Sequence, residues 1–118
     1  MMDGFKSKAY IELLEKLGPE QSLVLIDKLM IDVRNTRRGL RAAHVAKAVD
    51  LLKEPSHVLI SLAGVVGAET LHINAKDVNE YKSLNGEFPS IMVKETIAQL
   101  DDWLQFLKSD RVARGQAI

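Results

Sequence analysis

The sequence predicts an all-α protein, an up-and-down four-helix bundle with a short additional helix at its N-terminus. Apolar residues recur at three- and four-residue spacings through most of the 118 residues. No segment alternates cleanly with the period of two that is typical of strands, and aromatic residues make up only 5% of the chain. Short breaks separate the periodic segments, which favours packing of successive helices side by side in alternating directions.

The first two predicted helices meet at Gly18-Pro19. Apolar residues recur every four positions from Phe5 to Leu17, which predicts a short first helix over about residues 5–17. Glycine ends this helix, and proline suits the first turn of the next one because no hydrogen bond is lost there. A three-and-four spacing then continues to Leu40, so the second helix is expected to run from about residue 19 into the low forties.

The third predicted helix runs from about Asp50 or Pro55 to Val66. Its start is open, since Pro55 either begins the helix or kinks it near its start. Gly67 breaks the apolar pattern, and the pair Asn85-Gly86 is expected to end a fourth helix. The apolar residues that trace this fourth helix are Leu71, Ala75, Val78 and Tyr81.

Ser90, which follows Pro89, suits the N-cap of a fifth helix. The apolar stripe of this helix consists of Ile97, Leu100, Leu104 and Leu107. Beyond about Ser109 the side chains are polar or small, so we do not expect firm order in this tail. Residues 1–118 are predicted to form one domain, because a chain of this length buries roughly two-thirds of its unfolded surface around a single core.

Composition excludes several classes of protein. The chain has no cysteine, which rules out disulfides and thiolate zinc sites and fits a reducing compartment. Sixteen basic and sixteen acidic residues give no net charge, so a nucleic-acid partner held by bulk electrostatics is not favoured. No apolar run approaches the roughly 20 residues that span a membrane, and charges interrupt the N-terminal segment where a signal peptide would be apolar. We therefore expect a cytoplasmic protein with no membrane or nucleic-acid partner.

Charge is unevenly distributed along the chain. Between Arg34 and Lys53, six basic residues stand against the single acid Asp50, a local charge of about +5. Four of them fall at i, i+3, i+4 and i+7 and form one arginine stripe, namely Arg34, Arg37, Arg38 and Arg41. The arginine stripe is either a solvated helix face or a docking surface for an acidic partner.

His57 lies on the predicted third helix, on a face of small side chains. On a helical wheel it shares that face with Ser61, Gly64 and Ala68, while the apolar residues point elsewhere. Glycine inside a helix costs about 1 kcal/mol relative to alanine, so Gly64 indicates close approach by a packed helix or by a partner. An exposed ring nitrogen on a rigid mount suits a nucleophile that a second protein must reach.

The segment from His57 to Ala68 resembles the signature of histidine-phosphotransfer domains, which is roughly H-x-x-K-G-[SA]-[SA]-x-x-[IVL]-G-A. The order and lengths of the predicted helices are also similar to that family over most of the chain. Two departures from the signature matter for the chemistry, because Ile60 stands where the family carries lysine and Ser61 where it carries glycine. The residues that match are His57, Ala63, Gly64, Val66, Gly67, Ala68 and, soon after, Leu71.

The resemblance implies a phosphoryl carrier that is not itself an enzyme. His57 would accept a phosphoryl group from the aspartate of a response-regulator receiver domain and pass it to another, in a pathway with a histidine kinase. It implies no cofactor on this chain, because the receiver would supply the magnesium ion. The family lysine helps to hold the phosphoryl oxygens, so Lys53 or a residue of the arginine stripe, such as Arg38 or Arg41, would have to replace it. Ser61 would offer one hydroxyl donor.

Other interpretations remain open on the sequence. A degenerate bundle would bind a receiver or a kinase without being phosphorylated, as Ile60 suggests, and an unrelated helical module would use the arginine stripe on some other acidic surface. His44 offers a second H-x-x-K pattern with Lys47 but lacks the glycine-alanine ending, whereas His72 is expected to be structural or solvated. The 3 histidines have no metal-ligand spacing, and no Ser-His-Asp, phosphate-loop or paired-carboxylate pattern stands out.

Overall fold

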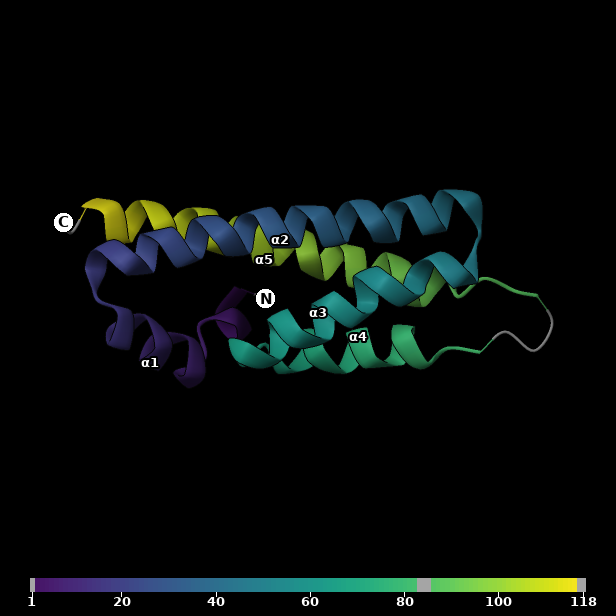
Figure 1. The fold of residues 1–118 in the computed structure, drawn as a ribbon, viewed down its shortest axis with the longest axis horizontal. Helices are drawn as coiled ribbons and strands as arrows, with labels where there is room; N and C mark the ends of the chain where they lie inside the picture. The colour runs from purple at the N-terminus through teal and green to yellow at the C-terminus, as the bar shows by residue number, and fades with distance from the viewer. Residues whose placement is uncertain (1, 83–85, 117–118) are drawn as a thin grey trace.

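Every regular element of the described chain is helical, which confirms the predicted all-α class (Figure 1). The computed structural model describes residues 2–82 and 86–116. The protein is elongated, with principal extents of 53 × 22 × 21 Å. Its elements in chain order are η1 (Met2–Phe5), α1 (Lys8–Leu17), α2 (Pro19–Ala46), η2 (Val49–Leu52), α3 (Lys53–Val65), α4 (Glu69–Glu80) and α5 (Ser90–Gln116).

Two long helices, α2 and α5, lie side by side along the protein, and the shorter α3–α4 hairpin packs beside them (Figure 1). α2 contacts both α5 and α3, and α4 contacts both α3 and α5, so these four helices surround one core. α1 packs on α2 near the end where α2 begins (Figure 1). The architecture is a helical bundle whose third and fourth helices form one contiguous hairpin of the chain.

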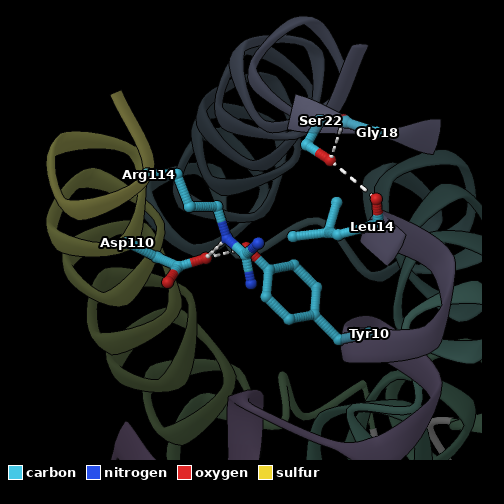
Figure 2. Close-up of polar contacts among 6 residues, drawn as sticks. All are labelled: Tyr10, Leu14, Gly18, Ser22, Asp110 and Arg114. Carbon is cyan, nitrogen blue, oxygen red and sulfur yellow. Dashed lines mark hydrogen bonds and ion pairs between the residues drawn. The ribbon is translucent and has the colours of Figure 1, made fainter. Parts of the chain in front are cut away.

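The turn between α1 and α2 follows the predicted glycine-proline break. Gly18 takes a positive φ of 82°, and Pro19 is the first residue of α2. The buried Ser22 hydroxyl lies 2.6 Å from the Gly18 carbonyl and 2.9 Å from the Leu14 carbonyl and shares its hydrogen between them (Figure 2). These bonds satisfy carbonyls at the end of α1 and hold α1 against α2.

Pro55 lies in the first turn of α3 and does not kink it. The 3-10 helix η2 leads directly into α3 at Lys53, so the proline takes a position where no intrahelical hydrogen bond is lost. The ring packs against α2 at Gly39, where an added Cβ would lie 3.0 Å from the Pro55 Cβ. Glycine at position 39 therefore allows α2 and α3 to approach closely.

The turn between α3 and α4 requires glycine at position 67. Gly67 has a φ of 69°, and an added Cβ would lie 2.9 Å from the Ser7 Oγ and 3.0 Å from the Ala9 Cβ. The Ser7 hydroxyl donates a hydrogen bond of 2.6 Å to the Val66 carbonyl. The start of α1 thus closes over this turn.

Ala68 is buried in the core and does not share the exposed face of His57, so that prediction is wrong. α3 ends at Val65, and the helical wheel that predicted the shared face no longer applies three residues later. The Ala68 N–H instead donates to the Ala63 carbonyl at 2.9 Å, a bond of the turn. The turn and the core therefore account for the glycine-alanine pair.

Two boundaries around the last connection differ from the predictions. α4 ends at Glu80, earlier than the expected end near Asn85-Gly86, of which Asn85 lies outside the described residues. Ser90, the predicted N-cap, is the first residue of α5 itself. The shift at Ser90 lies within the one or two residues to which a helix end is defined, whereas α4 ends about five residues before Asn85.

The prediction of a loosely ordered tail after Ser109 is wrong, because α5 continues to Gln116. Polar side chains in its last turns contact other helices. The Arg111 guanidinium donates two hydrogen bonds to the Asp27 carboxylate of α2, at 2.9 and 3.2 Å. The polar side chains that suggested a frayed tail therefore form ion pairs that hold the end of α5 in place.

A second polar cluster joins the end of α5 to α1 (Figure 2). The buried Tyr10 donates its hydroxyl to Asp110 at 2.6 Å, and Arg114 donates to the same carboxylate oxygen at 2.7 Å. The guanidinium carbon of Arg114 lies 5.8 Å from the centre of the Tyr10 ring. Burial raises the pKa of Tyr10, and the hydrogen bond to Asp110 raises it further.

The core is formed by the inner faces of all the α-helices. Its largest buried side chain, Trp103 on α5, stacks on Phe5 of η1 with the ring centres 6.0 Å apart. The N-terminal segment is thereby held against the last helix. The other large side chains that are fully buried are Tyr10, Leu14, Ile26, Leu40, Leu52, Leu59, Leu71, Leu100 and Leu107.

Candidate functional site

His57 projects from the second turn of α3 and is exposed. Lys53 and Ser61, each one helical turn from His57, are exposed as well. Gly64, two turns after His57, is also exposed. The structure therefore brings together four of the residues that the sequence singled out, on one outward face of α3.

The opposite face of α3 is anchored in the core. Leu59 is fully buried, and the buried Ser56 hydroxyl donates to the Leu52 carbonyl at 2.6 Å. The same hydroxyl accepts a hydrogen bond of 3.0 Å from the Asn79 amide of α4. The residue before His57 is thus tied to two elements, and the imidazole has a rigid mount.

Ile60, at the position of the family lysine, is half-buried and packs against the core. The nearest cation on the same helix is Lys53, whose Nζ donates to the Asn79 backbone carbonyl at 2.8 Å. That carbonyl belongs to the last turn of α4, where a cation also interacts favourably with the helix dipole. Lys53 therefore caps the C-terminal end of α4 next to His57.

Packing does not explain the glycine at position 64. Its φ is not positive, and an added Cβ would lie 3.6 Å from His72 Nε2, an ordinary van der Waals distance. Alanine would fit there and would be about 1 kcal/mol better for the helix. Gly64 differs in this respect from Gly39 and Gly67, where a Cβ would meet its neighbours at about 3 Å.

A second row of polar side chains, on α4, lies beside this face. His72, Lys76 and Asn79 recur at i, i+4 and i+7 and so occupy one side of that helix. Asn79 bonds to Ser56 and His72 lies against Gly64, so this side of α4 faces α3. Periodicity predicts the helix but not its pairing, so sequence alone could not assign Lys76 to this surface.

Arg38 and Arg41 do not come together with His57, which corrects their predicted place in the phosphoryl environment. The whole arginine stripe lines a hollow of about 340 Å³ together with Asp101 and Leu104 of α5, and no α3 residue lines it. Arg37 is ion-paired with Asp101 across this hollow. The wrong prediction arose because a stripe on α2 can face either of its neighbours.

A groove between α2 and α3 borders the other flank of the His57 face. It has a volume of about 520 Å³ and exposes apolar side chains, with Leu51 52% and Val58 39% exposed. Its rim carries three carboxylates, those of Asp32, Asp50 and Glu54. The surface beside His57 is therefore apolar and acidic on this flank.

His44 has a different environment from His57. It is half-buried on α2, with its ring 5.7 Å from the Phe88 ring and its Nε2 3.2 Å from Lys47 Nζ. Partial burial lowers the pKa of His44, and the charges of Lys47 and Lys94 lower it further. The lysine of this H-x-x-K pattern lies against the imidazole itself.

In residues 2–82 and 86–116, no group of three or more histidine, aspartate or glutamate side chains could hold a metal ion. No helix in that part of the chain is long and apolar enough to cross a membrane.

In comparisons with known proteins, no family model, curated protein or solved structure matches this chain.

Proposed function

We propose that this chain is a histidine-containing phosphotransfer protein of a two-component phosphorelay and that His57 is the residue that becomes phosphorylated. It acts as a carrier that partner proteins load and unload, and it is not an enzyme on its own. Its partners are response-regulator receiver domains and a histidine kinase, and it meets them in the cytoplasm. The receiver brings the magnesium ion, so the chain needs no cofactor of its own.

The glycine at position 64 is the observation that carries this proposal. Gly64 weakens α3 without a return in packing, because alanine would fit against His72. Because glycine has no side chain, nothing protrudes from the outward face of α3 at position 64, between His57 and the end of the helix. A receiver domain needs that clearance to bring its aspartyl phosphate to a histidine on a helix surface.

The transfer itself requires little from this chain. A neutral nitrogen of the His57 ring attacks the phosphorus, the new nitrogen–phosphorus bond forms, and the bond from phosphorus to the aspartyl oxygen breaks. The aspartate leaves as a carboxylate, and the reverse exchange loads the next receiver. A rigid helix that fixes the imidazole, as the Ser56 bonds do, supplies the orientation on which such a reaction depends.

A second candidate function is that of a receiver- or kinase-binding adaptor that is never phosphorylated. The packing of Ile60 against the core favours it, because the helix that carries His57 offers no lysine at that position. The apolar and acidic groove beside α3 would serve binding without transfer.

Phosphoryl transfer from a labelled receiver decides between these functions. We expect acid-labile label on the wild type and on His44→Gln but none on His57→Gln, measured with a panel of phosphorylated receivers. Label that persists in His57→Gln and is lost in His44→Gln would move the site to α2. Receiver binding without label would establish the adaptor. If neither label nor binding is found, the chain is an unrelated helical module.

Gly64→Gln tests the clearance separately from the chemistry. We expect it to slow transfer from a receiver at least tenfold while labelling by a small phosphoryl donor is unchanged. The unfolding midpoint of Gly64→Gln serves as the control for folding. Equal receiver rates in the two proteins would contradict the role given to Gly64.

A further inference from the structure

Where α3 packs against α4, along a line that we call the α3–α4 seam, Lys76 of α4 lies opposite Ile60 of α3. Ile60 is the position at which the family signature carries lysine. Two contacts fix the register of these antiparallel helices, Ser56 with Asn79 and Gly64 with His72. On α3, Ile60 lies midway between Ser56 and Gly64. On α4, Lys76 lies at about the midpoint between His72 and Asn79. Lys76 is therefore level with Ile60, across the seam.

The side chains of His57 and Lys76 both lie on the solvent side of the contact between α3 and α4. His72 and Asn79 are half-buried between the helices, whereas Lys76 on the same side of α4 is exposed. Ile60 is likewise half-buried, and His57 is exposed. His57 is three residues from the level of Lys76, or about 4.5 Å along the axis. Paired helices lie about 8–10 Å apart, a gap that the long lysine stem can cross.

The charge of Lys76 is available. In the part of the chain that the structure describes, Lys76 forms no ion pair, whereas the Lys53 ammonium is bound to the Asn79 carbonyl. Ile60 offers apolar surface over which a lysine stem can lie while its ammonium stays in water. The nearest carboxylates along the two helices are Glu54 on α3 and Asp77 and Glu80 on α4, all exposed.

We infer that the Lys76 ammonium holds the phosphoryl oxygens on His57 and replaces, from α4, the cation that Ile60 removes from α3. This inference rests on the function proposed above. A phosphoryl group brings negative charge to a surface bordered by the carboxylates of the α2–α3 groove. A cation on the opposite flank stabilises that charge in the transition state and in the phosphohistidine. Lys76 is thus a binding residue for the phosphoryl group, whereas Lys53 keeps the end of α4 in place.

Phosphoramidate is a suitable small donor, because it needs no receiver surface. Its phosphorus–nitrogen bond breaks, ammonia leaves with a proton from solvent, and a bond from phosphorus to the His57 ring forms. The rate of labelling and the lifetime of the phosphohistidine are read by phosphorus NMR. We expect Lys76→Gln to slow labelling about three- to fivefold and to shorten the lifetime similarly, with an unchanged unfolding midpoint.

Three further variants make the test specific. Lys76→Arg should keep the wild-type rate, and Ile60→Lys should restore it in the Lys76→Gln background, because the charge then returns from across the seam. Lys53→Gln should lower the unfolding midpoint and leave the lifetime unchanged. Wild-type rate and lifetime in Lys76→Gln would overturn the inference while phosphorylation of His57 stands. Absence of label on the wild type with both phosphoramidate and receivers would instead overturn the proposed function and this inference with it.

Discussion

The Tyr10 hydroxyl and the Asp110 carboxylate share a hydrogen bond of 2.6 Å, although 100 residues separate them in the chain. Tyr10 is fully buried in α1, and Asp110 stands near the end of α5 with its side chain 11% exposed. Arg114 donates to the same carboxylate oxygen, so the phenol completes a small charged cluster (Figure 2). This cluster joins the first and last α-helices.

Tyr10→Phe should destabilise the protein by about 2 kcal/mol. The substitution keeps the ring and removes one hydrogen bond to a charged group, which is worth about 1.5–3 kcal/mol. Urea unfolding followed by circular dichroism measures the change. Tyr81→Phe is the matched control, since its hydroxyl donates to the Glu87 carbonyl at an exposed site and should cost less. Equal losses in the two variants would contradict the assignment.

The stability of the wild type should fall at alkaline pH because of Tyr10. Burial raises the pKa of Tyr10 above its ordinary value of 10.0, and the bond to Asp110 raises it further. A raised pKa means that the contribution of this phenol is fully present below that ordinary value and is lost as the pH rises above it. The difference in unfolding free energy between wild type and Tyr10→Phe should therefore shrink above about pH 10. A difference that is constant with pH would be the contrary result.

Alanine at two helical glycines should have opposite effects. Gly64→Ala should raise the free energy of unfolding by up to about 1 kcal/mol, since its Cβ meets only an ordinary contact at 3.6 Å. Gly39→Ala should lower it by about 1 kcal/mol or more, because its Cβ would lie 3.0 Å from the stiff Pro55 ring. Thermal and urea unfolding of both variants measure the signs. Destabilisation by Gly64→Ala would show that packing, not clearance, requires that glycine.

Arg111→Gln should raise the pKa of Asp27 towards its ordinary value. The hydrogen bond from Arg111 is the main cause that lowers this pKa, burial opposes it, and the charge of Arg111 lowers it further. Because the pKa is lowered, the stabilisation from this pair exists above the ordinary pKa of aspartate and is lost as the pH falls. A carbon-detected NMR titration of the Asp27 carboxyl measures the shift. Lys28→Gln, which removes a neighbouring cation paired with Asp32, should leave it unchanged.

The periodicity of the sequence predicts much of the fold, for a physical reason. Helix starts and stops at Gly18-Pro19 and Gly67 follow from backbone chemistry that acts locally, and the structure confirms both breaks. The end of α5 could not be predicted in this way. Its order depends on Asp27 and Tyr10, which are distant in sequence, so local polarity gave the wrong answer.

The candidate site was predicted in part. The exposure of His57, Ser61 and Gly64 follows from the period of one helix, and the structure confirms that these residues share a face. Ala68 was misplaced because the helical period stops at the turn. The partners of α3 across its seams depend on which helices pair, and a single sequence contains no direct signal of that pairing. Lys76 was therefore missed, and Arg38 and Arg41 were assigned to the wrong neighbour.

The α3–α4 hairpin and the Tyr10 cluster have no residue in common. Substitutions around His57, in the first turns of α3, should add to substitutions in the Tyr10 cluster without interaction, because Ser7 connects α1 to the other end of the hairpin, at the Val66 carbonyl. Residues around His57 can therefore change while the Tyr10 cluster is kept. An ancestor could exchange residues along the hairpin, and so gain, alter or lose a chemical role, while the ends of α1 and α5 keep the scaffold folded throughout.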